Sequence, residues 1–141
     1  MNIKKIEADF LKGLFSTQSF KYTMTEYEGR IGYSDGCYVA LVYPINAHVK
    51  CDKKFKIENI LDKKERCHGI YEYTITTKFG NLAKYERADE QGCVYIDVKY
   101  TKYFSPNAEY MVAGRKDLVY VYENDELVGI ICPVNFMEGV K

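Results

Sequence analysis

The stretch from Cys93 to Met137 constrains the fold more than any other part of the sequence. It begins with a strand pattern over 93–96 and a helix over 98–104, which Asp97 can cap. Three strands follow, over 109–113, 118–123 and 127–132, with turn-forming residues between them. A strand, a short helix and a three-stranded meander make a complete supersecondary unit. The stretch therefore predicts helix packed on antiparallel sheet.

The rest of the chain alternates the same two patterns. Apolar residues at 3, 6, 10, 11 and 14 predict an amphipathic helix over 2–15. A second helix is expected over 52–64, with Asp52 as its N-cap. The expected strands cover 20–28, 30–33, 37–43, 70–78 and 82–87. We predict one α+β domain over 1–141, an antiparallel sheet with two or three short helices packed on one face.

Composition limits the function classes. The chain has 14 tyrosines and no tryptophan, a bias that suits half-buried strands. Lys and Arg total 20, as do Asp and Glu, so a DNA contact would need a local stripe of positive charge. There is no charged-then-apolar leader and no apolar run near the roughly 20 residues that span a bilayer. We expect a cytoplasmic protein that does not contact membranes.

The cysteines and histidines offer little chemistry. The five cysteines are odd in number and form no Cys-x-x-Cys pair, so we expect reduced, mostly buried thiols. His48, Cys51, Cys67 and His68 supply four potential zinc ligands, and Cys67 with His68 is also a nucleophile and base pair by residue type. Adjacent residues point opposite ways in an extended chain. We therefore expect no metal, no cofactor and no catalytic site.

The chain contains a partial internal repeat. Placing Pro44 on Pro133 aligns Tyr33 with Tyr122, and each copy has the order strand, turn, strand, Pro, aliphatic residue, Asn. Two hairpins in one sheet protein can share this pattern by chance. The other interpretation is a duplicated unit of one helix and three strands, covering about 3–46 and 98–135. Such a pair would form a pseudo-twofold domain with helices on one face.

The carboxyl-terminal segments YIDVKYTKYF, EYMVAG, LVYVYEND and LVGIICPVN resemble the closing half of a bacterial DNA sliding-clamp domain, a polymerase processivity factor. The resemblance covers roughly the last third of the chain. Family members carry three such domains and close a ring as dimers, so this chain would need about six copies. The tail Cys132-Pro133-Val134-Asn135 also lacks the arginine of the family.

The resemblance implies two surfaces. The short helices would face DNA, with phosphate contacts from Lys99 and Lys102 and, across from them, Lys53, Lys54 and Lys56 or Lys63, Lys64 and Arg66. An apolar pocket for partner peptides would include Pro133, Val134, Phe136 and Met137. The alternative interpretations are solvated lysines on exposed helix faces, and ordinary core packing or a disordered tail.

Two functional hypotheses follow. The first is a non-enzymatic clamp-like binding module, of phage or mobile-element origin, that engages DNA or a DNA-processing protein. The second is a small inhibitor or adaptor that binds one host protein without DNA contact and can form a homodimer through an exposed strand edge.

Overall fold

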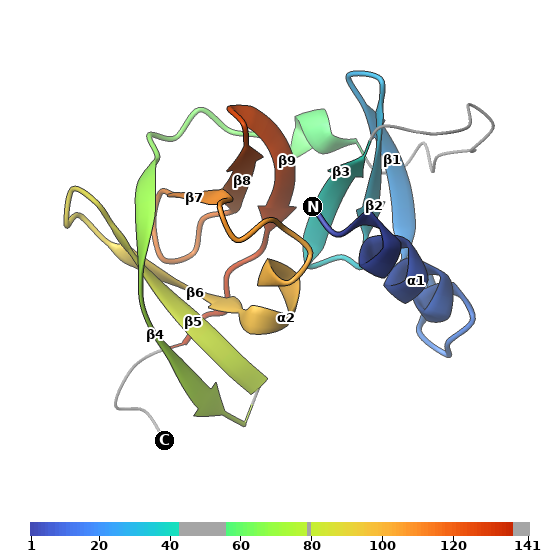
Figure 1. Ribbon diagram of the computed structural model, residues 1–141, viewed down its shortest axis with the longest axis horizontal. Coiled ribbons are helices and arrows are strands. Elements are labelled where there is room, and N and C mark those ends of the chain that lie inside the picture. The colour runs from blue at the N-terminus through green and yellow to red at the C-terminus, as the bar shows by residue number, and fades with distance from the viewer. Residues whose placement is uncertain (43–55, 79, 137–141) are drawn as a thin grey trace.

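The computed structural model describes residues 1–42, 56–78 and 80–136 (Figure 1). Within these residues, two α-helices, two 3₁₀ turns and nine strands follow one another. Their order is α1 (Ile3–Leu14), η1 (Ser19–Lys21), β1 (Thr23–Tyr27), β2 (Arg30–Ser34), β3 (Tyr38–Val42), η2 (Ile57–Asn59), β4 (Cys67–Thr77), β5 (Gly80–Arg87), β6 (Cys93–Asp97), α2 (Val98–Thr101), β7 (Glu109–Val112), β8 (Val119–Glu123) and β9 (Glu126–Ile131).

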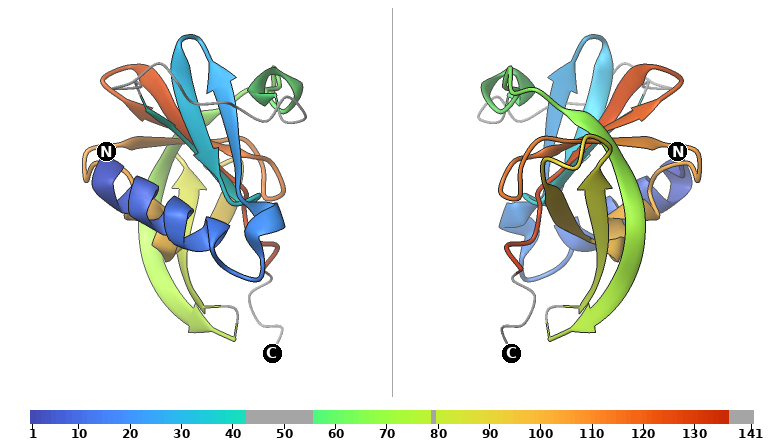
Figure 2. Two further views of the ribbon diagram at one scale, coloured as in Figure 1. Left: turned by 90° about the vertical axis from the view of Figure 1, so that its right-hand side faces the viewer. Right: turned by 90° about the vertical axis from the view of Figure 1, so that its left-hand side faces the viewer.

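The strands form one antiparallel sheet in the order β1-β2-β3-β9-β8-β7-β4-β5-β6. Strand β4 changes partner along its length: Cys67 and His68 pair with β7, and Gly69 to Thr77 pair with β5. Figure 2 shows β4 as a long arc, and the β4-β5-β6 part of the sheet turns away from the rest along it. The predicted antiparallel sheet is confirmed. The described part of the chain is richer in strand than the predicted α+β class.

Apolar side chains cover both faces of the central strands, because alternate residues of a strand point to opposite sides. In β3, Tyr38 and Ala40 face a core shared with α1 and α2. Val39 and Leu41 face a second core, which Ile57 of η2 covers. Both α-helices therefore pack on one face of the sheet, and η2 packs on the other.

The helix starts follow from capping. The Asn2 side chain accepts a hydrogen bond from the Lys5 backbone N–H and begins α1. The Asp97 carboxylate accepts from the Lys99 N–H at 3.0 Å and begins α2, as predicted. Helix α2 ends at Thr101, earlier than the predicted 104, and the following turn carries Tyr103 and Phe104 into the core.

The predicted helix over 52–64 is wrong in its described part. Residues 57–59 form one 3₁₀ turn and 61–66 have no regular structure; Asp52 and its neighbours up to 55 lie outside the described residues. The backbone N–H of Asp62 donates to the Tyr120 hydroxyl at 2.8 Å instead of to a helical carbonyl. A side chain of β8 thus takes a bond that a helix would need.

Two smaller predictions also need correction. The strand expected from residue 20 begins at Thr23, because 19–21 form the turn η1. The thiols expected in the core are not buried: Cys37 is exposed and Cys67, Cys93 and Cys132 are half-buried. Each of these four lies at or next to a strand end, where the sheet gives less cover. Cys51 lies outside the described residues.

The chain after β9 closes the outer edge of β6. The N–H of Cys132 donates to the Cys37 carbonyl, and the N–H of Val134 donates to the Tyr95 carbonyl, both at 2.8 Å. The Phe136 ring lies edge-on against Tyr95, with 5.1 Å between centroids. At Val134 this segment pairs one backbone carbonyl of β6, a strand at the edge of the sheet.

Buried tyrosines fill the junction between the helices and β3. The rings of Tyr38 and Tyr103 stack with 4.9 Å between centroids, and Tyr100 lies 5.1 Å from Tyr38. The Tyr103 hydroxyl donates to Asp9 at 2.7 Å and the Tyr100 hydroxyl to Asp35 at 3.1 Å. Burial, aided by these carboxylates, raises the pKa of all three phenols well above the ordinary value.

These tyrosines should make the fold sensitive to alkali. Their stabilising effect is complete below their unfolded pKa of about 10 and is lost as pH rises toward the folded-state pKa. In an alkaline titration, the last rise in tyrosinate absorbance should coincide with loss of the sheet's circular dichroism. Tyr38→Phe should move this transition to higher pH, and the exposed control Tyr71→Phe should not. Full ionisation with the fold retained would contradict the prediction.

Candidate functional site

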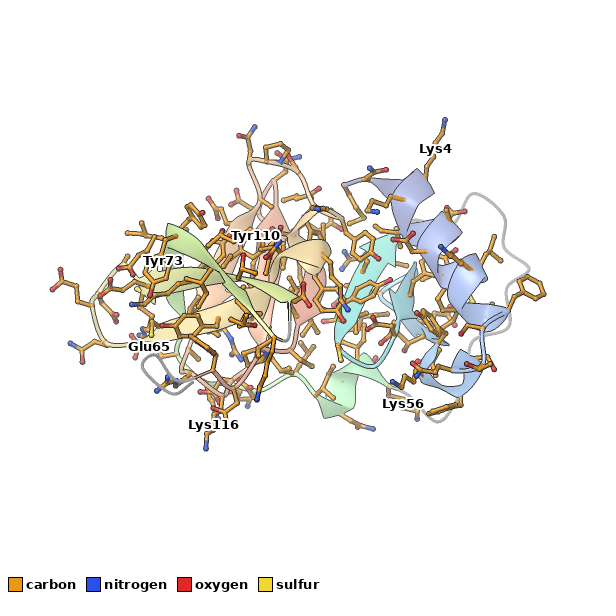
Figure 3. All side chains as sticks on the ribbon, turned by 90° about the horizontal axis from the view of Figure 1, so that it is seen from below. Lys4, Lys56, Glu65, Tyr73, Tyr110 and Lys116 are labelled. Carbon is orange, nitrogen blue, oxygen red and sulfur yellow. The ribbon has the colours of Figure 1, made fainter. Side chains whose placement is uncertain are left out.

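The structure separates the lysines predicted to contact DNA. Lys99 and Lys102 lie at α2, on the helix-bearing face, whereas Lys56 precedes η2 on the opposite face. Figure 3 shows the same division, with Lys4 of α1 and Lys56 on opposite sides of the molecule. Lys53 and Lys54 lie outside the described residues. Lys56 therefore does not form one phosphate-binding stripe with Lys99 and Lys102.

Two of the three basic residues offered as the alternative stripe, Lys64 and Arg66, are already engaged. Lys64 pairs with Asp117. The Arg66 guanidinium stacks on Tyr120 with 3.6 Å to the ring centroid and donates to both Asp62 carboxylate oxygens, at 2.6 and 3.1 Å. Lys63 is exposed. These residues lie on the same face as η2, beside an open depression of about 360 Å³.

Arg66 holds the segment between η2 and β4 in place through hydrogen bonds to that segment and to the residue before β8. It also donates to the Leu118 carbonyl, through Nε at 3.1 Å and Nη2 at 3.0 Å. Its hydrogen bond to Asp62 lowers the pKa of that carboxyl to about 2. Since its guanidinium is occupied by groups of its own chain, Arg66 is poorly placed to bind a phosphate or to act in catalysis.

The peptide-binding residues predicted near the chain end have structural contacts. Val134 and Phe136 lie on β6, as described above, and the Phe136 carbonyl accepts a hydrogen bond from Arg115. Pro133 is half-buried next to them, and Met137 lies outside the described residues. The structure brings these three residues together as a cover for β6.

An apolar groove does exist close to that position. It has a volume of about 410 Å³ and includes Cys132, the residue before Pro133. Val39 and Ile130 are buried residues of its lining, and the lining also includes Ile60, Leu118 and Phe20. Pro133, Val134 and Phe136 are not among the residues that line this groove. Its lining could not be found from the sequence, because these five residues come from five separate segments of the chain.

The proposed zinc and thiol residues do not assemble in the described part of the chain. His48 and Cys51 lie outside it. Cys67 and His68 are adjacent in β4, and His68 Nδ1 lies 4.0 Å from a Glu109 carboxylate oxygen. Residues 1–42, 56–78 and 80–136 contain no group of three or more metal-ligating side chains.

A surface not predicted from the sequence is the exposed apolar side of α1 and η1. Of seven large apolar side chains exposed in the described residues, five lie here, and the other two are on β4. We call this surface the α1–η1 patch: Ile3, Leu11, Leu14, Phe15 and Phe20. Phe15 is 89% exposed and Phe20 is 77% exposed. Spacings of three and four residues place Leu11, Leu14 and Phe15 on one side of the helix.

The sequence contained a clue to this patch. Five apolar positions in α1 predict one amphipathic stripe, but the buried residues of the helix are Ile6, Phe10 and Gly13. Leu11 and Leu14 lie beyond that arc and face solvent. An apolar arc wider than one sheet face can cover predicts a second contact surface.

Comparison with protein-family models, curated proteins and solved structures finds no match to this chain. Within the described residues, neither α-helix has the length and apolar character needed to cross a bilayer.

Replacing Arg66 by Lys should destabilise the protein by about 1–3 kcal/mol, because the forked bonds to Asp62 and the stacking on Tyr120 are lost. Urea unfolding measures the loss, and carboxyl NMR should show the Asp62 pKa rising toward 3.8. The stabilisation from Asp62 is present above that ordinary value and lost as pH falls through about 2. The control Lys64→Ala removes an exposed ion pair and should barely move the unfolding midpoint. Equal losses of unfolding free energy in the two variants would contradict this structural role of Arg66.

Proposed function

We propose that the chain is a non-enzymatic binding module that docks a protein partner through the α1–η1 patch. The observation that carries this proposal is the concentration of exposed large apolar side chains on α1 and η1. Single exposed apolar residues are ordinary, whereas five of the seven exposed large apolar side chains lie on two neighbouring elements here, two of them highly exposed phenylalanines, which is typical of an interaction site. Aromatic side chains are also the usual anchors of protein interfaces.

Charge around the patch defines the partner. Lys4 and Lys12 of α1 and Lys21 of η1 are exposed, and Glu7 lies four residues from both Ile3 and Leu11, on the same side of the helix. Asp9 pairs with Lys5, so these three lysines stand against the one carboxylate of Glu7 on this stretch. Lys21 donates to the neutral Gln18 side chain, so it keeps its charge available. The partner we propose therefore has an apolar surface with an acidic rim. Such a rim would speed association and fix orientation more than it adds affinity.

The clamp-like fold remains part of the proposal. The sheet order places β1-β2-β3 and β9-β8-β7 side by side, each with one helix before it in the chain. Ala40 of β3 pairs with Gly129 of β9, and these two residues are also aligned by the internal repeat. This symmetry supports duplication of a helix-and-three-strand unit. Strands β4 to β6 are then an insertion between the two copies.

Contact with DNA is less well supported than contact with protein. Lys56 lies on the other face from Lys99 and Lys102. Lys99 also lies 3.9 Å from the Asp97 carboxylate and 4.9 Å from the Tyr100 ring, so part of its charge is offset locally. Of the two hypotheses from the sequence, we therefore propose the protein-binding adaptor on a clamp-like scaffold.

Substituting both phenylalanines should abolish partner binding. Partner proteins are first captured with the wild-type chain from cells that express it, and each is then purified. We expect each partner to bind Phe15→Ser/Phe20→Ser at least about 30-fold more weakly than it binds the wild-type chain. The matched control is Lys63→Ser/Lys116→Ser, which removes two exposed side chains outside the α1–η1 patch. Isothermal titration calorimetry with each purified partner measures the loss.

Further measurements test the competing functions: self-association, DNA binding and membrane binding. Light scattering on a sizing column should give the mass of one 16.4 kDa chain. Neither a short DNA duplex at low salt nor vesicles with anionic lipid should bind. A multimer, or vesicle binding that depends on Phe15 and Phe20, would assign the patch to another role. DNA binding that weakens steeply with salt would restore the clamp hypothesis.

A further inference from the structure

Strand β4 has an outer edge that the described residues leave open. Its pairing with β7 covers Cys67 and His68, and from Gly69 onward β4 pairs with β5 alone. Residues 70–76 therefore carry backbone groups on the β7 side without a strand partner among the described residues. The outer edge of β6 differs, because the segment after β9 contacts it and the N–H of Val134 donates to the Tyr95 carbonyl. An open strand edge is a template for a further strand.

A depression lies next to this edge. It has a volume of about 770 Å³. Three aromatic residues line it: Tyr85 of β5, Phe104 of the turn after α2, and Tyr110 of β7. The Tyr71 ring of β4 lies 5.7 Å from the Tyr85 ring, which in turn lies 5.0 Å from Tyr110. A row of three tyrosine rings thus leads from the open edge into the depression.

The exposed side chains on the edge support binding of an apolar segment. Ile70 is 57% exposed and Tyr71 is 54% exposed, and they are the remaining two of the seven exposed apolar residues noted above. Of the described residues that line the depression, Lys102 alone carries a charged side chain. A ligand with alternating apolar side chains and one carboxylate would match both features.

The bend of β4 selects the kind of occupant. A β-bulge lies between Tyr71 and Tyr73, and Figure 2 shows the strand as an arc. Bulges discourage edge-to-edge pairing of two preformed sheets, because each edge twists away from the other. A single flexible segment can follow such a bend. The geometry therefore disfavours a second copy of this chain and favours an extended peptide.

We propose that an extended acidic and apolar peptide segment of a partner protein adds as a strand to the open edge of β4 over 70–76, with its apolar side chains in the aromatic depression and a carboxylate on Lys102. This is a second contact surface, separate from the α1–η1 patch. Backbone pairing supplies affinity in this mode of recognition, and pockets for alternate side chains supply specificity.

The test uses peptides selected from a random phage-displayed library against the full chain. We expect selected sequences to alternate large apolar with polar residues and to contain Asp or Glu. The best peptide is then synthesised in two N-methylated forms, each methylated at alternate residues. Because alternate N–H groups of a strand point to opposite edges, one form should bind at least about 20-fold more weakly and the other within about threefold, by fluorescence polarisation.

Protein variants locate the contact. Lys102→Glu and Tyr71→Ser should each weaken the unmethylated peptide about tenfold, whereas Lys99→Glu should change binding less than twofold. Hydrogen exchange should show new protection within 70–76. Phe15→Ser/Phe20→Ser should have no effect, so this proposal and the α1–η1 proposal can fail separately.

Three outcomes of the peptide experiments would overturn the proposal. They are equal binding by the two N-methylated forms, new protection outside 70–76, and a selection that yields no peptide sensitive to Tyr71→Ser. Concentration-dependent dimerisation lost in Tyr71→Ser would also overturn it, in favour of a second copy at this edge.

Discussion

The pairing of β3 with β9 is the interaction on which the rest of the structure depends. It joins two three-stranded units that are far apart in the chain, through Tyr38, Val39 and Ala40 opposite Ile131, Ile130 and Gly129. A Cβ at residue 129 would overlap the Phe104 ring and lie 3.0 Å from the Val39 carbonyl oxygen. Only glycine lets the α2 turn pack this closely on the sheet. The helix-bearing core, and with it the orientation of α1, is built on this contact.

Local physical signals in the sequence predicted the elements that depend on local structure. Asp97 caps α2 as predicted, and the strands expected over 30–33 and 37–43 are present as β2 and β3, joined by a bend at residues 35–37. The helix over 52–64 failed because Tyr120, far away in the chain, provides a competing hydrogen-bond partner. Side-chain periodicity could not show this, since it contains no information on what packs against the segment.

The candidate sites show the same limit. Lys99 and Lys102 were correctly placed at one helix, but the relation of Lys56 to them depends on which sheet face η2 covers. Phe15 and Phe20 resembled core residues by type, and their exposure follows from how little of α1 the sheet covers. Surface function in this chain is decided by what tertiary packing leaves uncovered. The sequence alone lists the apolar residues without showing which of them the fold can bury.

The central claim is that the fold leaves apolar side chains of α1 and η1 in solvent while the sheet core is buried. Solvent paramagnetic relaxation tests it most directly, with aromatic NMR signals recorded in the presence of a soluble relaxation agent. We expect strong broadening of Phe15 and Phe20, and protection of Phe10 and Phe104, which are buried in the core. Protection of Phe15 and Phe20 equal to that of Phe10 in the free protein would contradict the account.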